Sequence, residues 1–281
     1  ASQWLVGQLT NGLIHNNGYG GFDDYGLTVD TGLALIATGT QPAAVTTVAN
    51  ALAANIDSYV GDGTTSIYAG STGKAAVFAK DAGRDPASFG GRNLIAQLEG
   101  TVATTAPIAG RIQDTSSYGD YANVLGQAWA VEALDRSGSA KAASATDFLL
   151  KQQCSEGYFR TYLTTDKTAA DQTCDGGKAA SASDPSTDTT ALAVITLSQH
   201  SKTPAVSAAL AKAKGWLAAA QAADGSWGGG AGTSTSNSNS TGLATRALTG
   251  TASAKRGVAW LTARQATAND GALAGEAGAI A

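Results

Sequence analysis

The stretch from Ala205 to Leu248 limits most strongly what this chain can fold into. Its apolar residues recur at spacings of three and four, which predicts one apolar helix face: Val206, Leu210, Ala213, Trp216, Leu217 and Ala220. Thr203-Pro204 is typical of a helix start, and Asp224-Gly225 predicts its end. A second helix is expected from about residue 240 to 250. The unit is a helix, a glycine-aromatic loop and a second helix.

Degenerate copies of this unit recur along the whole chain. Outer helices are expected at Gln3-Trp4-Leu5, Val48 to Ile56, Leu94-Ile95, Phe148-Leu149, Trp216-Leu217 and Trp260-Leu261, and the helical pairs of the later copies are followed by Gln152, Gln221 and Gln265. Inner helices, apolar nearly all round, are expected to begin at Asp30, Ser71, Asn123, Asp188 and Ser240, and Glu276 is expected to begin a sixth that the end of the chain truncates. Such self-similarity is typical of stacked helical hairpins. Because the glycine-rich loops fall at the same end of each pair, a closed ring is favoured over an open solenoid.

Composition bounds the size of the core and the kinds of partner. With 281 residues and 43% apolar content, the chain can bury a large core, and the repeat predicts a single domain over 1–281. The net charge of −4 and the lack of a large basic cluster argue against nucleic acid as a partner. No run of eighteen apolar residues is present, so no transmembrane segment is predicted.

Cys154 and Cys174 are the two cysteines of the chain, and we expect them to form a disulfide that closes an insertion over about 154–184. Such a bond would contribute about 3 kcal/mol by loop-closure entropy. It implies an oxidising compartment, so a secreted or cell-surface, extracellular location is predicted. The alternative is two free buried thiols. A zinc site would need further ligands, and His15 and His200 are the only histidines, so no metal is predicted.

The segment Lys214 to Trp227, K-G-W-L-A-A-A-Q-A-A-D-G-S-W, resembles the QW repeat of the prenyltransferase and squalene-cyclase superfamily. The resemblance extends over nearly the whole chain through the degenerate copies. It implies an all-α fold, an (α/α) toroid of about six helical hairpins with inner and outer helix rings around a cavity. The vitamin-binding domain of the transcobalamin and intrinsic-factor proteins shares that fold. In composition the chain is most similar to secreted actinobacterial proteins with such repeats.

The chemistry of that superfamily is only partly matched. Class II terpene cyclases protonate their substrate with an Asp-x-Asp-Asp-Thr motif, and the matching segments here are Thr28-Val29-Asp30-Thr31 and Ser186-Thr187-Asp188-Thr189. Only the final aspartate of the motif is retained, so Asp30 and Asp188 are weak catalytic candidates and are interpreted as helix N-caps. The zinc ligands of protein prenyltransferases and a Gly-Cys-Gly-Glu-Gln thioester element are also missing. These absences argue against an enzyme, and no cofactor is predicted.

The inner-helix N-termini are expected to converge on one mouth of the toroid, where loops supply aromatic and polar side chains. The ligand-binding candidates are Phe22, Asp23, Asp24, Tyr25, Tyr68, Arg111, Asp114, Tyr118, Asp120, Tyr121 and Trp227. In the alternative interpretation, the tyrosines fill the toroid and the aspartates cap helices.

The leading hypothesis is a secreted, non-catalytic toroid that binds a vitamin-like or saccharide ligand, or a cell-surface protein partner, at this mouth. One alternative is an enzyme, either a divergent terpenoid cyclase or prenyltransferase-like protein or a polysaccharide lyase-like one. Another is a structural component of a cell wall or filament.

Overall fold

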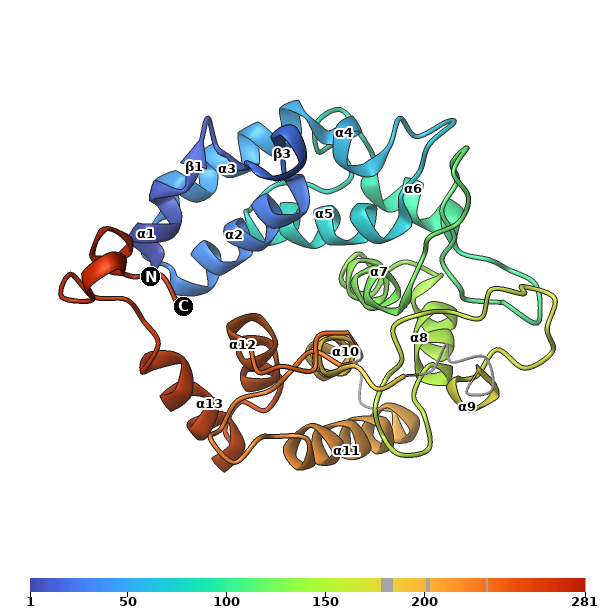
Figure 1. Ribbon diagram of the computed structural model, residues 1–281. Coiled ribbons are helices and arrows are strands. Elements are labelled where there is room, and N and C mark those ends of the chain that lie inside the picture. The colour runs from blue at the N-terminus through green and yellow to red at the C-terminus, as the bar shows by residue number, and fades with distance from the viewer. Residues whose placement is uncertain (178–183, 201–202, 231, 281) are drawn as a thin grey trace. The chain divides into compact units, whose positions relative to one another are not determined.

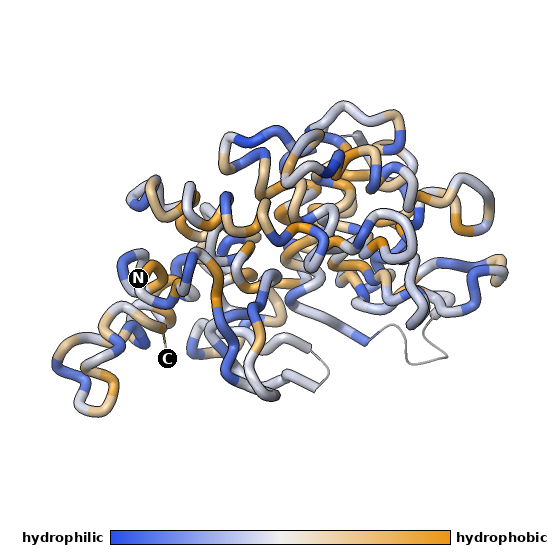
Figure 2. The backbone as a smooth tube through the Cα atoms, turned by 90° about the horizontal axis from the view of Figure 1, so that it is seen from above, coloured by the Kyte–Doolittle hydropathy of each residue, from blue (hydrophilic) through white to orange (hydrophobic). Residues whose placement is uncertain are grey.

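The computed structural model describes residues 1–177, 184–200, 203–230 and 232–280. Contacts between Cα atoms divide the chain into two compact units: Ala1–Thr101, Asp114–Asp120 and Gln265–Ala281 form the first, and Val102–Gln113 and Tyr121–Arg264 form the second. The prediction of one domain over 1–281 stays a prediction. Along the described chain, hydrophobic and hydrophilic residues alternate in short stretches (Figure 2).

The first unit consists of helical pairs and a small antiparallel sheet. Its helices are α1 (Ser2–Gly7), α2 (Tyr25–Thr38), α3 (Pro42–Ala54), α4 (Ile56–Val60), α5 (Ala69–Asp81) and α6 (Leu94–Thr101). Its strands are β1 (Leu9–Thr10), β2 (Leu13–Asn16) and β3 (Phe22–Asp23), in the order β1-β2-β3. Helix α2 packs against α3, and α5 packs against both α6 and α2. The predicted pairing of neighbouring helices is therefore present here.

The second unit contains α7 (Val124–Arg136), α8 (Ala142–Lys151), α9 (Cys174–Gly177), α10 (Thr187–Gln199), α11 (Pro204–Ala219), α12 (Ser238–Ala247) and α13 (Ala252–Thr262). Helix α10 lies between α7 and α12, and each of these three packs against the helix that follows it, α11, α8 and α13 respectively (Figure 1). Ten of the thirteen residues of α10 are buried, which agrees with a helix that is apolar nearly all round and enclosed by others.

The recurring glutamines and glycines tie each loop to the next outer helix. Gln221 Nε2 donates hydrogen bonds to the carbonyls of Gly225 and Ser253, both at 2.9 Å. Gln153 makes the same pair of bonds in the preceding copy, so it, and not the predicted Gln152, is the equivalent residue. At Gly225, φ is 95° and a Cβ atom would lie 2.9 Å from the Arg256 carbonyl oxygen. Glycine is the residue that suits this left-handed backbone and close approach.

Several helices begin at other residues than predicted. The Asn123 side chain caps α7, as predicted, by accepting from Gly126 N. Helix α2, however, is capped by Asp24, and α10 is capped by Ser186. The interpretation of Asp30 and Asp188 as N-caps is therefore wrong, because neither side chain precedes the first helical turn.

The end of the chain also differs from the prediction. Glu276 does not begin an inner helix, because it ends a 3₁₀ helix, Gly271–Glu276. Its carboxylate accepts a hydrogen bond of 2.7 Å from Trp4 Nε1 on α1. The C-terminal segment thus packs against the N-terminal helix within the first unit.

The predicted disulfide between Cys154 and Cys174 is confirmed. Both cysteines are buried with Tyr158, and the half-buried Trp216 packs against this cluster. The last part of the predicted insertion, residues 178–183, lies outside the described residues. None of the helices in the described ranges combines the length and hydropathy needed to cross a membrane.

Candidate active site

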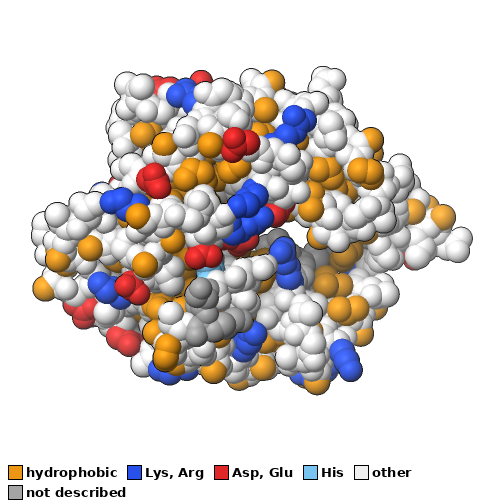
Figure 3. Space-filling view, turned by 180° about the vertical axis from the view of Figure 1, so that it is seen from behind, with side chains coloured by type: hydrophobic (Ala, Val, Ile, Leu, Met, Phe, Trp, Pro, Cys, Tyr) orange, Lys and Arg blue, Asp and Glu red, His pale blue; other side chains and the backbone are white. Residues whose placement is uncertain are grey.

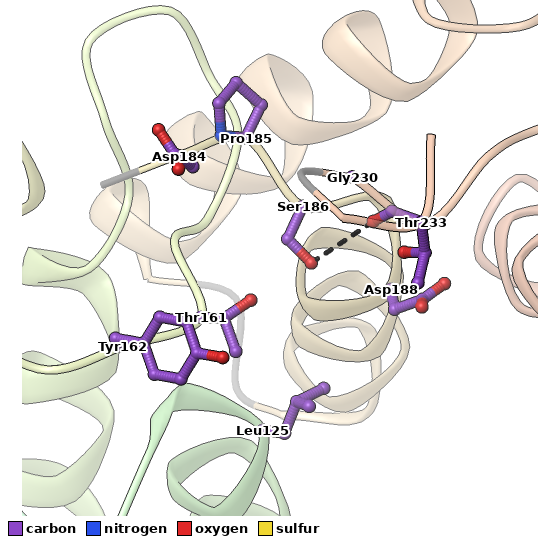
Figure 4. Close-up of a pocket in the computed structure, with 10 residues that line it drawn as sticks. Leu125, Thr161, Tyr162, Asp184, Pro185, Ser186, Asp188, Gly230 and Thr233 are labelled. Atoms are coloured by element: carbon purple, nitrogen blue, oxygen red, sulfur yellow. Dashed lines mark hydrogen bonds between the residues drawn. The ribbon is translucent and has the colours of Figure 1, made fainter. Parts of the chain in front are cut away.

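A cavity of about 270 Å³ lies within the second unit, at the N-terminal end of α10. The side chains that line it include Leu125, Thr161, Tyr162, Ser186, Asp188 and Thr233 (Figure 4). They come from the start of α7, from the segment after Phe159, from the start of α10 and from the loop before α12. The lining combines hydroxyl groups, one aromatic ring and one helical carboxyl group.

Backbone hydrogen bonds hold the loop that contains Gly229 and Gly230 against the first turn of α10. Ser186 forms an isolated antiparallel bridge with Gly230, and Thr187 N donates to the Gly229 carbonyl at 2.9 Å. Ser186 Oγ caps the helix by accepting from Thr189 N at 3.2 Å, and its contact with the Gly229 carbonyl is drawn in Figure 4. Because Ser186 serves as the cap, the Asp188 side chain is not required for capping.

Asp188 is half-buried, and one of its two carboxyl oxygens is shielded from water. Its Oδ1 atom is buried and has no hydrogen-bond partner among the described residues. Burial raises the pKa of Asp188 above 3.8, and a hydrogen bond from the Ser240 hydroxyl, on α12, opposes part of that rise. Compared with a surface aspartate, Asp188 therefore keeps its proton to higher pH.

The missing side chain of Gly229 makes room for this carboxyl group. A Cβ atom at position 229 would lie 3.0 Å from Asp188 Oδ2 and 3.1 Å from Ser240 Oγ. Ser240 itself is 1% exposed. The half-buried carboxyl group and the buried hydroxyl group thus lie between α10, α12 and the loop at Gly229.

The opposite wall comes from the segment that contains Thr161 and Tyr162. Tyr162 pairs with Asn123 in an isolated bridge, and Val124 N donates to the Thr161 carbonyl at 2.9 Å, which fixes this segment to the start of α7. The hydroxyls of Thr161 and Thr189 lie 2.8 Å apart. The Tyr162 side chain is 68% exposed, so its ring has an accessible face beside the cavity.

Asp30, the other aspartate suggested by the sequence, has different surroundings. It lies within α2, its side chain is 54% exposed, and its carboxylate is 2.7 Å from Lys74 Nζ. Lys74 also donates to the Gly26 carbonyl at 3.0 Å. A solvated carboxylate held in an ion pair is poorly suited to donate a proton to an apolar substrate.

Most of the predicted ligand-binding residues lie in the first unit: Phe22, Asp23, Asp24, Tyr25, Tyr68, Asp114, Tyr118 and Asp120. Three of their carboxylates accept backbone hydrogen bonds of 2.8 Å, Asp24 from Leu27, Asp114 from Ala69 and Asp120 from Asp114. Asp23 pairs with His15 at 3.1 Å.

The aromatic members of this group differ in exposure. Phe22 and Tyr118 are 45% and 80% exposed, whereas Tyr25 and Tyr68 are half-buried. Tyr25 lies 6.5 Å from Tyr59, measured between ring centroids. Phe22 and Tyr118 therefore retain most of the aromatic surface of this group.

The other three predicted ligand-binding residues, Arg111, Tyr121 and Trp227, belong to the second unit. Tyr121 is 71% exposed. Trp227 is 1% exposed and its Nε1 donates to the Leu217 carbonyl at 2.8 Å, while Arg111 is 3% exposed and donates to the Thr164 carbonyl at 2.6 Å. Both side chains are buried and bonded within the core, so neither is an exposed group at a loop surface, and their contact with a ligand stays a prediction.

The residues that sequence reasoning missed are Tyr162, Thr161, Ser240 and Gly229. The sequence contained a signal for Ser240, because it lies in the first turn of α12, the next inner helix after α10. The side-chain positions bring one set of potential metal ligands together: among the described residues, ligand atoms of Cys154, Glu156 and Asp175 lie within 4.8 Å of one another, but the Cys154 sulfur is already bonded in the disulfide.

On the face of the molecule drawn in Figure 3, positively and negatively charged side chains are interspersed.

Comparisons with known proteins give structural matches alone. No protein-family model matches the sequence, and a search of curated proteins finds no match. Among solved structures, the chain is similar to the type II terpene cyclase MstE from Scytonema, with 17% identity and a TM-score of 0.68, covering 94% of this chain and 76% of that one. A protein from Actinoplanes matches with 19% identity and a TM-score of 0.66, covering 94% and 78%.

Two further matches are MstE variants with bound molecules. One holds geranylgeranyl dihydroxybenzoate, its substrate, with 16% identity, a TM-score of 0.68 and coverage of 94% and 76%. The other holds merosterolic acid A, its product, with 17% identity, a TM-score of 0.67 and coverage of 94% and 78%.

The MstE structures contradict the expectation of a non-catalytic binding protein, since MstE is a cyclase with substrate and product complexes, and they support the cyclase-like alternative better. They confirm the predicted all-α class and architecture. The chain has a terpenoid cyclase-like (α/α)-toroid fold.

Proposed function

We propose that the protein is an enzyme of the type II terpene cyclase kind, which cyclises a prenyl-derived small molecule after protonating it. Asp188 is the proposed proton donor. The observation that carries the proposal is the Asp188 carboxyl group, which lines the cavity and has a pKa raised by burial. The similarity in fold to cyclases that bind a geranylgeranyl substrate supports the choice of substrate class.

The proposed reaction is an isomerisation in which no atoms are gained or lost. Asp188 gives its proton to the terminal alkene of a prenyl chain, and the resulting tertiary carbocation is attacked by the next alkene to form a ring. A final carbocation loses a proton, and Asp188 is protonated again from solvent. A general acid works best when its pKa lies near the working pH, so a raised pKa favours this role.

The neighbours of Asp188 fit the other requirements of such a step. The Tyr162 ring beside the cavity presents a π face, which can stabilise a nearby cation. The hydrogen bond from Ser240 stabilises the carboxylate left after proton transfer. The retained Asp188-Thr189 pair is the part of the cyclase motif that the sequence preserves at this position.

The cavity volume limits how much of the substrate it encloses. At about 270 Å³ it falls just below the range of roughly 300–1,000 Å³ typical of small-molecule pockets. We therefore propose that the reacting end of the prenyl chain occupies the cavity, with the remainder of the substrate outside it.

The experiment is turnover in D₂O. The purified protein is incubated with dihydroxybenzoates that bear geranyl, farnesyl or geranylgeranyl chains, and the products are analysed by gas chromatography and mass spectrometry after derivatisation. The proposal predicts a cyclised isomer that contains one deuterium. General acid catalysis typically accelerates a reaction by about 100- to 10,000-fold, so Asp188→Asn should lower the turnover rate at least about 100-fold.

Asp30→Asn is the matched control, since it makes the same change at the other aspartate of the two motif-like segments. It should retain the turnover of the unmodified protein, because Asp30 lies on the exposed side of α2 in an ion pair. Absence of any cyclised product from all three chain lengths, or equal loss in both variants, would contradict the proposal.

A second part of the proposal concerns location. We propose that the protein is extracellular, either secreted or at the cell surface, and of actinobacterial origin. The buried Cys154–Cys174 disulfide supports an oxidising compartment. Fractionation of the producing organism, with an antibody against this chain, tests the location.

A further inference from the structure

The segment closed by the Cys154–Cys174 disulfide contains part of the wall of the candidate active site. The two cysteines are 20 residues apart, and Thr161 and Tyr162, which lie between them in the sequence, line the cavity (Figure 4). Buried hydrogen bonds within this segment connect the disulfide to these two lining residues. The connection runs through Arg160.

Arg160 directly precedes the two lining residues and joins the two arms of the closed segment. It is 0% exposed. Its Nε and Nη2 atoms donate to Gln152 Oε1 at 2.9 and 2.7 Å, and Nη2 also donates to the Gln172 carbonyl at 3.0 Å. Gln152 Nε2 donates to the same carbonyl at 3.2 Å. A planar guanidinium bonded in several fixed directions holds the backbone that carries it in a defined position.

The disulfide keeps Gln172 beside this guanidinium. Gln172 is two residues before Cys174 and is 3% exposed. On the other arm, Cys154 N donates to the Tyr158 carbonyl at 2.9 Å, and Tyr158 is two residues before Arg160. The covalent bond between the arms therefore limits how far the Gln172 carbonyl can move from Arg160.

The ring of Tyr162 is presented by a backbone that is fixed on both sides. Tyr162 itself is 68% exposed, and it pairs with Asn123 in an isolated bridge. Two residues later, the Thr164 hydroxyl accepts from Arg160 Nη2 at 3.0 Å, and the Thr164 carbonyl accepts from Arg111 Nη1 at 2.6 Å. The position of the exposed ring thus depends on the buried arginines behind it.

From these contacts we infer that Arg160 is a positioning residue for Tyr162 and that the disulfide holds Arg160 in place. The geometry of the candidate active site then depends on the oxidised state of the two cysteines. A dithiol supplies two electrons and two protons: the Cys154–Cys174 bond breaks, two thiols form, and the dithiol becomes a disulfide. Gln172 loses its covalent link to the Cys154 arm, and Tyr162 is displaced. The effect on turnover rests on the proposed function, whereas the displacement of Tyr162 does not.

A fluorine label on Tyr162 tests the inference without a substrate. The full chain carries 3-fluorotyrosine at position 162, and its ¹⁹F NMR signal is recorded before and after reduction with dithiothreitol in the absence of denaturant. We expect the signal to shift on reduction and to return on reoxidation. The same label at Tyr118, which is 80% exposed and belongs to the other unit, should not respond. Thiol titration verifies reduction, and circular dichroism verifies folding.

Two variants keep the test decisive if the buried disulfide resists the reagent or the reduced protein unfolds. The Cys154→Ala, Cys174→Ala double variant removes the bond, and Arg160→Lys retains the charge but loses the planar fork with the bond intact. Both should shift the Tyr162 signal, whereas Arg246→Lys, at an exposed position of α12, should not. A Tyr162 signal unchanged in every folded form would overturn the inference.

The disulfide and Arg160 should also be coupled, because both act through the Gln172 carbonyl. Reduction should therefore shift the Tyr162 signal less in Arg160→Lys than in the unmodified protein. Shifts that simply add would overturn the link between the disulfide and Arg160.

Turnover of the prenylated dihydroxybenzoates separates this inference from the proposed function. A misplacement of about 1 Å in a site can cost about 100-fold, so the folded, reduced protein should turn over more slowly, by up to that factor. Equal turnover in the oxidised and reduced forms would overturn the inference and leave the cyclase proposal intact. A Tyr162 signal that responds to reduction, in a protein that converts none of the substrates, would support the positioning of Tyr162 and contradict the cyclase proposal.

Discussion

The Ser240 hydroxyl, on α12, hydrogen bonds to the carboxyl group of Asp188, in the first turn of α10. Burial and this hydrogen bond act on the pKa of Asp188 in opposite directions, and burial has the larger effect. Because Ser240 lies on α12 and Asp188 on α10, the protonation state of Asp188 depends on how these two helices pack. Its consequences are measurable in activity and in stability.

Ser240→Ala should raise the pKa of Asp188 further, since the hydroxyl that stabilises the carboxylate is lost while burial remains. If Asp188 is the proton donor, the limb of the activity profile that falls as pH rises should move to higher pH. The measurement is the pH dependence of kcat/KM. Ser238→Ala, in the same helical turn, is the control, and an identical profile for Ser240→Ala would argue against the link.

Asp188→Asn should change the pH dependence of stability. The folded-state pKa of Asp188 lies above 3.8, so the folded protein binds more protons than the unfolded chain between 3.8 and the raised value. The contribution of Asp188 is therefore favourable below this window and is lost as the pH rises through it. Urea unfolding at several pH values should show Asp188→Asn gaining stability relative to the unmodified protein across this window. Asp30→Asn should lack this gain.

Gly225→Ala and Gly215→Ala should have opposite effects on stability. Gly225 has φ of 95°, and a Cβ there would lie 2.9 Å from the Arg256 carbonyl oxygen, so alanine should cost more than about 1 kcal/mol. Gly215 lies inside α11, and nothing lies within 4 Å of its Cβ position. Alanine at 215 should stabilise by about 0.5–1 kcal/mol through helix propensity. Thermal and urea unfolding measure both. Equal effects would contradict the loop packing described above.

Reduction of the Cys154–Cys174 bond should destabilise the protein by about 3 kcal/mol, because the closed loop restricts the unfolded chain. The Cys154→Ala, Cys174→Ala double variant should show a similar loss in urea unfolding. It should not respond to reductant, which is the control. A midpoint that stays the same after complete reduction, verified by thiol titration, would contradict the prediction.

The helical pairs were predictable from the sequence because their signals are local. Apolar residues at helical spacing determine which face of α11 is buried, and Asn123 carries its own capping group. Gln221 and Gly225 act within one copy of the repeat and between adjacent copies, so repetition alone marks them. The cysteine pair, separated by 20 residues, also lies within one segment.

The difference between the two candidate aspartates was decided by tertiary structure. Asp30 and Asp188 are each followed by threonine and an apolar run, so their local sequences predict the same role. Lys74, from α5, forms an ion pair with Asp30 at an exposed position, whereas α12 and the Gly229 loop cover part of Asp188. The loss of water around a carboxyl group depends on which other segments pack over it, and that information is spread over distant parts of the chain.

The stretch from Ala205 to Leu248 shows the same division. By itself it determined two helices, their caps within a few residues, and a glycine loop between them. It did not show that Trp227 turns into the core and donates to Leu217, nor that Ser240 meets Asp188. Helix periodicity and turn chemistry are properties of neighbouring residues, while burial and proton affinity arise only when the folded chain brings separate helices into contact.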